Sequence, residues 1–153
     1  MAIVRYTGTD TRGFVGMHAN MEEWNTLSRR ADNVVASPIG MGQPVARLAG
    51  NDRVVRAWTT GAAYGITVFQ HHVDDTTGYK EGDEVVVMTQ GVMWVGAGVA
   101  CVAGTAAAYN PTLDRWGPVA TGYTAVPGVE FDSNAAAGAL VKIRIQRPTA
   151  VAA

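Results

Sequence analysis

A short pattern that occurs twice, 62 residues apart, limits what this chain can fold into. Four residues recur in the same order at that spacing: Gly42, Asp52, Arg53 and Phe69 become Gly104, Asp114, Arg115 and Phe131. Each copy contains a glycine turn, a short strand of small residues, an Asp-Arg turn and a second strand. Two such units predict a small β-barrel or sandwich of short hairpins, because closing a sheet removes its unpaired edges.

The residue types agree with a mainly β fold. Val, Ile and Thr make up 41 of the 153 residues, against four Leu. Branched side chains pack well on a pleated surface, whereas helical bundles are built from Leu, Lys and Glu. We therefore expect a mainly β fold with a pseudo-duplicated unit.

Individual strands can be placed from turn residues and alternation. A hairpin is predicted for 45–48 and 53–58 about the turn Gly50-Asn51-Asp52. Strands over 84–88 and 92–95 flank Gln90-Gly91, which is interpreted as a turn or a bulge. Residues 141–147 alternate apolar and polar side chains, as in a strand with one buried face.

The N-terminal part of the chain differs from the rest. Residues 1–16 carry glycines without a regular period and predict an extended arm. Residues 20–30 predict the one short helix, with Asn20 as its N-cap and apolar residues at helical spacing. We divide the chain into an arm with a short helix (1–33), a β-barrel domain (34–148) and a tail (149–153).

Too many apolar residues lie in this N-terminal part to be left in water. We expect them to contact a sister subunit or another protein. The candidate interface residues are Ile3, Val4, Tyr6, Phe14, Val15, Met17, Met21 and Trp24.

Charge is scarce. Only 16% of residues are charged and the formal net charge is −1, where about 25% charged residues are usual. This balance offers no electrostatic case for binding nucleic acid or an acidic membrane. The N-terminus lacks the apolar core of an export signal, and no apolar run is long enough to span a membrane. A surface with so little charge suits contact with other proteins.

A reaction centre is hard to find in the sequence. His71, His72 and Asp74 form the densest polar cluster, but neighbouring residues on a strand point to opposite faces, and a zinc site needs three or four ligands. Gly96-Ala-Gly98 lacks the third glycine and the helix of a dinucleotide fingerprint. Cys101 lies in an apolar stretch. We expect no cofactor, no metal and no enzymatic activity.

The chain resembles the small all-β cement, or head decoration, proteins of bacteriophage capsids. The resemblance runs from Pro38 to Ile145, and it is clearest at the end, where an Ala/Gly turn leads into a short alternating strand. It rests on these segments: 42–45, 63–67, 79–87, 91–94, 126–131 and 133–145. Residues 1–33 are not part of it.

The resemblance implies a non-enzymatic protein made in the host cytoplasm and placed on the exterior of the virion. Proteins of this type bind the outer surface of an icosahedral head as trimers or dimers and hold adjacent major capsid subunits together. The implied partners are the major capsid protein and further copies of this chain, most simply as a homotrimer. The alternative is a β-domain of a phage fibre or cell-surface module that binds glycans through Trp58 or Trp116.

Overall fold

Nine β-strands form the fold in this computed structural model. The structure describes residues 13–32, 39–70, 73 and 78–146. The strands are β1 (Asn25–Ala31), β2 (Pro44–Leu48), β3 (Asn51–Ala57), β4 (Gly65–Thr67), β5 (Glu84–Gly96), β6 (Ala106–Asn110), β7 (Arg115–Pro118), β8 (Thr124–Phe131) and β9 (Leu140–Ile145). The prediction of a mainly β fold with a small barrel is confirmed.

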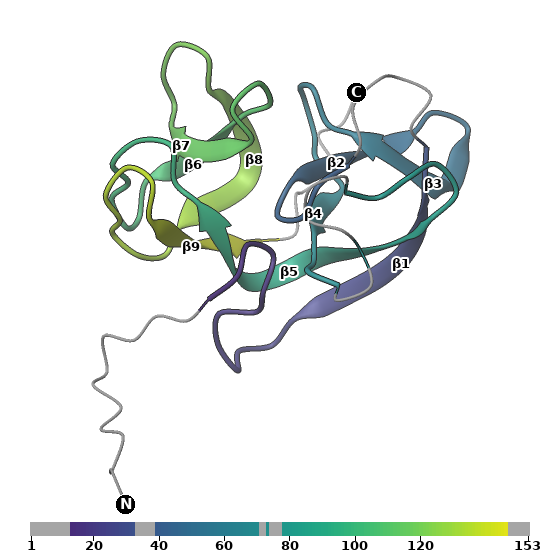
Figure 1. Cartoon of the computed structure of the whole chain (residues 1–153), viewed down its shortest axis with the longest axis horizontal. Helices are drawn as coiled ribbons and strands as arrows, with labels where there is room; N and C mark the ends of the chain where they lie inside the picture. Colours follow the sequence, from purple (N-terminus) through teal and green to yellow (C-terminus); the bar gives the residue numbers. More distant parts are fainter. Residues whose placement is uncertain (1–12, 33–38, 71–72, 74–77, 147–153) are drawn as a thin grey trace, which may run out of the picture.

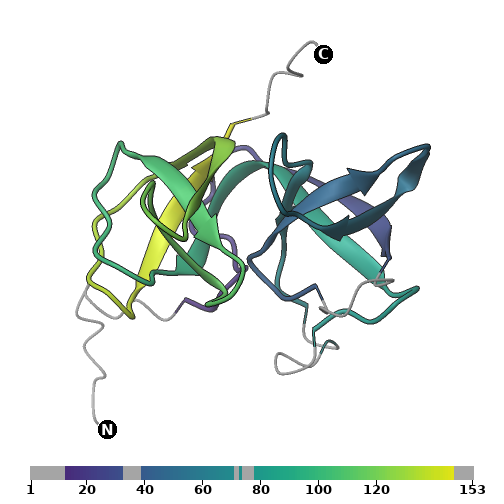
Figure 2. The ribbon, with the colours of Figure 1, turned by 90° about the horizontal axis from the view of Figure 1, so that it is seen from above.

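The strands make two small barrels that share the long strand β5 (Figures 1 and 2). The first barrel has the order β1-β3-β2-β4-β5, and pairing of β1 with β5 closes it. The second continues in the order β5-β9-β8-β6-β7. A parallel bridge between Ala97 and Trp116 joins its two ends. Closure of both sheets protects the strand edges that a small β domain would otherwise expose.

The pseudo-duplication is visible in matching backbone hydrogen bonds. Gly42 donates to Thr67 O at 2.9 Å at the start of β2, and Gly104 donates to Phe131 O at 2.7 Å at the start of β6. Both glycines have positive φ, at 68° and 82°, which a residue without a Cβ adopts at little cost.

The structural repeat begins earlier in the chain than the residues that recur in the sequence. Ala31 at the end of β1 accepts a hydrogen bond from Gly82 at 2.9 Å and pairs in parallel with Val55. Ala97 at the end of β5 accepts one from Gly138 at 2.8 Å and bridges Trp116 in parallel. Strand β1 is therefore the counterpart of the second half of β5, just as β2 and β3 are the counterparts of β6 and β7.

Two hydrophobic clusters fill the molecule. One lies inside the first barrel and includes Val45, Val55 and Val85. The other fills the second barrel and continues to Ile66 and Met88 on the first. The buried indole Nε1–H of Trp116 donates to Gly42 O at 2.8 Å, so a polar contact joins the two barrels as well.

The predicted helix over residues 20–30 is wrong. Residues Asn25–Ala31 form strand β1, and Met21 in the same window is 91% exposed. Asn20 caps a turn instead, because its side-chain oxygen accepts the N–H of Glu22 two residues on, at 3.2 Å. Pairing with β3 on one side and β5 on the other overrides the local helical pattern. β1 falls within residues 1–33, which the sequence pattern assigns to the arm and its helix.

The predicted hairpins fare better. β2 and β3 pair as an antiparallel hairpin about Gly50, which has a φ of 78°. Gln90-Gly91 does not reverse the chain, because β5 continues through it from Glu84 to Gly96. The register of β5 against β1 shifts beside Gln90, so the bulge interpretation is the right one.

Candidate functional site

The N-terminal segment, defined here as residues 13–24, binds across the junction of the two barrels. Gly16 donates to Trp94 O at 2.7 Å and accepts from Phe69 N at 2.9 Å. Trp94 N–H in turn donates to Met17 O at 2.9 Å, and His18 forms an antiparallel bridge with Met93. The segment thus adds an irregular strand to β5 and contacts the first barrel near Phe69.

The predicted interface residues divide into three groups. Phe14, Met21 and Trp24 are 58%, 91% and 42% exposed. Val15 and Met17 are half-buried against the barrels. Ile3, Val4 and Tyr6 lie outside the described residues.

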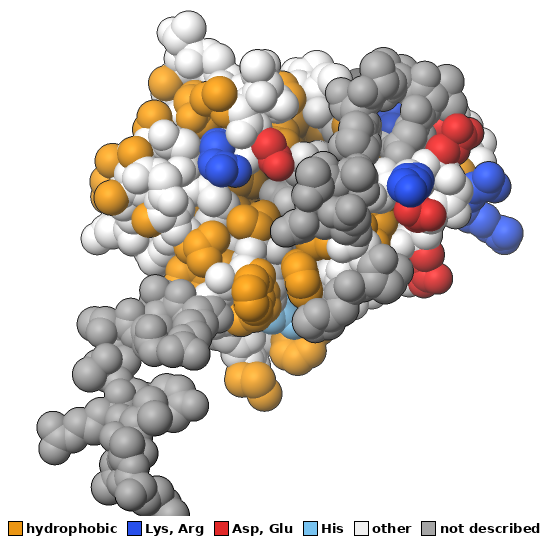
Figure 3. Space-filling view, viewed as in Figure 1, with side chains coloured by type: hydrophobic (Ala, Val, Ile, Leu, Met, Phe, Trp, Pro, Cys, Tyr) orange, Lys and Arg blue, Asp and Glu red, His pale blue; other side chains and the backbone are white. Residues whose placement is uncertain are grey.

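The three exposed side chains, together with Leu27 on β1, are defined here as the N-terminal apolar patch. Phe14 stacks on Phe69 with ring centroids 5.6 Å apart, and Trp24 lies 4.6 Å from the ring of His18. Burial lowers the pKa of His18, which favours its neutral form. Figure 3 shows hydrophobic side chains gathered around a histidine on this edge of the molecule. The patch presents aromatic and aliphatic surface with no charge at its centre.

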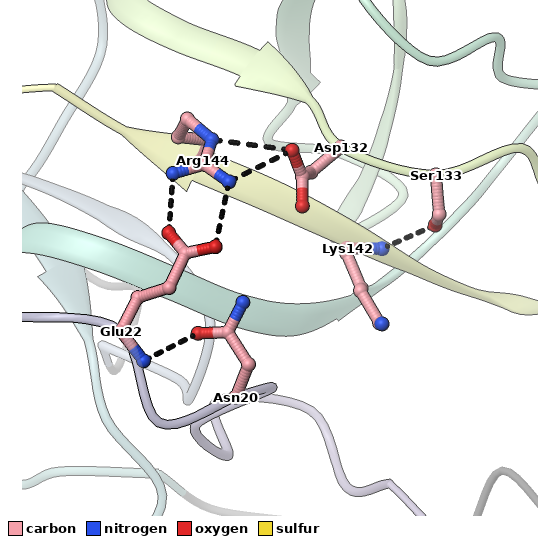
Figure 4. A network of polar contacts seen from close by, with 6 residues as sticks. All are labelled: Asn20, Glu22, Asp132, Ser133, Lys142 and Arg144. Carbon is pink, nitrogen blue, oxygen red and sulfur yellow. Dashed lines mark hydrogen bonds and ion pairs between the residues drawn. The ribbon is translucent and has the colours of Figure 1, made fainter.

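An ion-pair network ties the N-terminal segment to the second barrel (Figure 4). Arg144 on β9 donates from both Nη atoms to the carboxylate of Glu22, with Nη2–Oε1 at 3.1 Å. The same guanidinium donates from Nε to Asp132 Oδ1 at 3.1 Å. The two-pronged pairing fixes the direction in which the segment leaves the barrel.

Arg144 lowers the pKa of Glu22, chiefly through the hydrogen bonds that stabilise the charged carboxylate. A depressed folded-state pKa contributes stability above the ordinary value of 4.5, and this contribution is lost as the pH falls through the folded-state value. We expect Glu22→Gln to weaken protection from hydrogen exchange of the Ala19 amide, which donates to Val92 O at 3.0 Å, at pH 7, and this difference from the wild type to shrink as the pH is lowered below 4.5.

Glu23→Gln is the matched control, because Glu23 is an exposed neighbour that makes no ion pair within the described part of the chain. Equal protection in all three proteins at pH 7 would contradict the role of the network.

Comparison with known proteins identifies the family. Residues 4–146 match the family described as "Structural cement protein (E217 gp24/Pam3 gp6)". The chain belongs to this phage cement family. It is a structural protein of a bacteriophage capsid and has a decoration role there.

A solved capsid structure shares the fold. A chain described under "The capsid of Myoviridae Phage XM1" is 15% identical with a TM-score of 0.65, and the match covers 97% of this chain and 100% of that one. A second, "The crystal structure of head fiber gp8.5 N base in bacteriophage phi29", is 17% identical with a TM-score of 0.44 and covers 83% of this chain and 98% of that one. No curated protein sequence matches the chain.

The scarcity of charge is concentrated in the second barrel of this cement protein. Its stretches 96–113, 116–129 and 133–141 contain no Asp, Glu, Lys or Arg. The exposed large apolar residues of this barrel are Val99, Val102, Leu113 and Val119. Figure 3 shows the second barrel as mostly uncharged, whereas charged side chains gather over the first. Low charge reduces the desolvation cost of covering this surface with protein.

The glycan-binding alternative loses its support. It requires an indole that is free to stack on a sugar, but Trp58 and Trp116 are only 2% and 1% exposed. Their Nε1–H groups also donate hydrogen bonds, from Trp58 to Gly61 O and from Trp116 to Gly42 O. Both residues serve the hydrophobic core.

The described residues offer little reactive chemistry. They contain no group of three or more potential metal ligands, and they include no helix long and apolar enough to cross a membrane. Burial raises the pKa of Cys101, so its thiol stays protonated at neutral pH. Gly98 packs closely against the side chains of Tyr123 and Arg115, where a Cβ would find no room. His71, His72 and Asp74 lie outside the described residues.

Proposed function

We propose that the protein binds the outer surface of the phage head as a cement and holds neighbouring major capsid subunits together. The family match over residues 4–146 carries this proposal. The N-terminal apolar patch and the uncharged surface of the second barrel supply two separate regions for contact with more than one neighbour. Many copies on one shell make modest affinity per copy sufficient.

We further propose that the protein acts as a homo-oligomer, a trimer in the simplest arrangement, with a dimer as the second. The arm residues Ile3, Val4 and Tyr6, together with the N-terminal apolar patch, would contact a sister subunit or the capsid. Aromatic and methionine side chains are enriched in such interfaces, which supports this assignment.

The decisive experiment mixes purified protein with expanded heads that lack it and measures co-sedimentation. We expect the full chain to sediment with the heads and a variant lacking residues 1–12 to lose binding or oligomerisation. We expect this variant to stay folded, because it keeps the backbone hydrogen bonds described for residues 14–19. A variant lacking residues 149–153 is the matched control and should bind as the full chain does. Normal binding by the variant without residues 1–12 would exclude the arm from the interface.

A further inference from the structure

Two arginines and a tyrosine form an unusual cluster on the first barrel. Arg47 on β2 stacks over the ring of Tyr64, with its guanidinium carbon 4.4 Å from the ring centroid. Arg29 on β1 lies 5.4 Å from the same centroid and donates from Nη2 to Tyr64 OH at 2.7 Å. Arg29, Arg47 and Tyr64 are defined here as the cationic cluster.

The two arginines stand on the core-facing side of their strands. Side chains alternate along a strand, so Arg29 points to the same side as the buried Ala31, and Arg47 to the same side as the buried Val45. Arg47 nevertheless reaches solvent and is exposed, while Arg29 is half-buried. The cluster therefore lies where the inner face of the first barrel meets the solvent.

The second barrel provides an internal comparison. Matching of the repeat through Ala31 and Ala97 makes Val95 the counterpart of Arg29. Matching through Val55 and Trp116 makes Tyr109 the counterpart of Arg47. Val95 and Tyr109 are 0% and 3% exposed. Equivalent backbone positions therefore hold core side chains in the second barrel and two guanidinium groups in the first.

Among the residues that the structure describes, the cluster has no counter-ion. Neither Arg29 nor Arg47 forms an ion pair with any carboxylate in the ranges that the structure describes. Arg29 also has a buried Nε–H that meets no acceptor there, although its Nη1 donates to Ser28 O at 2.8 Å. Two adjacent positive charges without a carboxylate repel each other, and a buried donor without an acceptor costs free energy.

We propose that the cationic cluster binds an Asp or Glu side chain of a neighbouring major capsid subunit. A guanidinium matches a carboxylate with two parallel hydrogen bonds, and stacking on Tyr64 holds Arg47 in place for it. Arg and Tyr are also the residue types that most often dominate binding energy at protein interfaces. Two guanidiniums around one ring suit a single carboxylate better than the many phosphates of a nucleic acid.

This inference rests on the proposed cement function and adds the chemistry of the partner. The test compares head binding by the wild type, Arg47→Glu and Arg56→Glu. Arg56 lies on the paired strand β3, is exposed and belongs to the opposite side of the sheet from Arg47, so it receives the same charge change without touching the cluster. We expect Arg47→Glu to weaken binding by about tenfold or more, and Arg56→Glu to bind within about twofold of the wild type.

A cross-link identifies the occupant. Arg47→Lys keeps the charge and places an amine in the cluster, and a carbodiimide joins an amine to a carboxylate that touches it. The chain has only two lysines of its own, Lys80 and Lys142, so the background is low. We expect an adduct between position 47 and the major capsid protein, and no such adduct at position 56 from Arg56→Lys.

Other outcomes overturn the inference. Equal binding by Arg47→Glu and Arg56→Glu would remove the special role of the cluster. An adduct with a second copy of this chain, or none at all, would exclude a capsid carboxylate. Loss of wild-type binding after nuclease treatment would identify nucleic acid as the partner. Failure of the wild type itself to bind heads would instead overturn the proposed function, and this inference with it.

Discussion

Trp116→Ala should destabilise the protein more than any other single truncation in its core. The indole is 1% exposed and belongs to the hydrophobic cluster that joins the two barrels. Replacing a buried tryptophan with alanine costs about 3–5 kcal/mol, because transfer free energy is lost and a cavity remains. Total stabilities are about 5–15 kcal/mol, so the loss is a large share of the whole.

Two control variants separate the contribution of the Trp116 hydrogen bond from that of its buried ring. Trp116→Phe keeps most of the ring but removes the Nε1–H that donates to Gly42 O at 2.8 Å, and an unsatisfied buried acceptor costs about 1–3 kcal/mol. Trp94→Ala truncates a half-buried indole that contacts Lys142 and should cost less. The measurement is urea denaturation followed by circular dichroism. A free energy of unfolding for Trp116→Ala within about 1 kcal/mol of the wild type would show that the barrels do not depend on this contact.

Turn chemistry explains why much of the fold could be predicted. Gly42 and Gly104, which precede β2 and β6, have positive φ, and this conformation explains why a glycine occurs at both places in the repeat. Alternation in Leu140–Ile145 and the Gly50 turn likewise depend on local geometry that the residues themselves specify.

β1 could not be predicted, because its structure depends on distant partners. Its residues, Asn25–Ala31, show no alternation and include two adjacent arginines. Its counterpart in the second half of β5 is apolar, so the repeat leaves no sequence signal there. The pairing of β1 with both β3 and β5 is what makes it a strand. The same divergence, Arg29 against Val95, hides the cationic cluster from sequence reasoning.

The candidate functional site could likewise be predicted only in part from the sequence. Apolar residues in an N-terminal segment are easy to recognise as a candidate interface, and Phe14, Met21 and Trp24 are exposed in the structure. Their contact with a partner stays a prediction. The ion pair between Glu22 and Arg144 joins residues 122 apart in the sequence, so no local sequence pattern predicts it. The N-terminal segment is therefore anchored by contacts that only the tertiary structure provides.

Gly16→Val should release the N-terminal segment from the barrels. Gly16 has a φ of 84°, and a Cβ there would lie 2.8 Å from Phe69 N, a backbone atom that cannot move aside cheaply. A left-handed conformation costs a residue with a side chain about 1–2 kcal/mol, and overpacking adds about 1–3 kcal/mol. The segment can avoid both costs by detaching, which breaks the hydrogen bonds from Phe69 N to Gly16 O and from Trp94 N to Met17 O.

Hydrogen exchange at the Phe69 and Trp94 amides measures this release. If the free energy of local opening falls by about 2 kcal/mol or more, exchange becomes about 30-fold faster or more. Gly50→Val is the matched control. Gly50, in the β2–β3 turn, has a similar φ of 78°, but a Cβ there would meet nothing within 4 Å. Gly50→Val therefore has the cost of the left-handed conformation without the cost of overpacking. Protection of both amides should stay unchanged in that control. Unchanged protection in Gly16→Val as well would mean that the barrels yield to the new side chain. The positions of Phe14 and Met21 would then not depend on the close approach at Gly16.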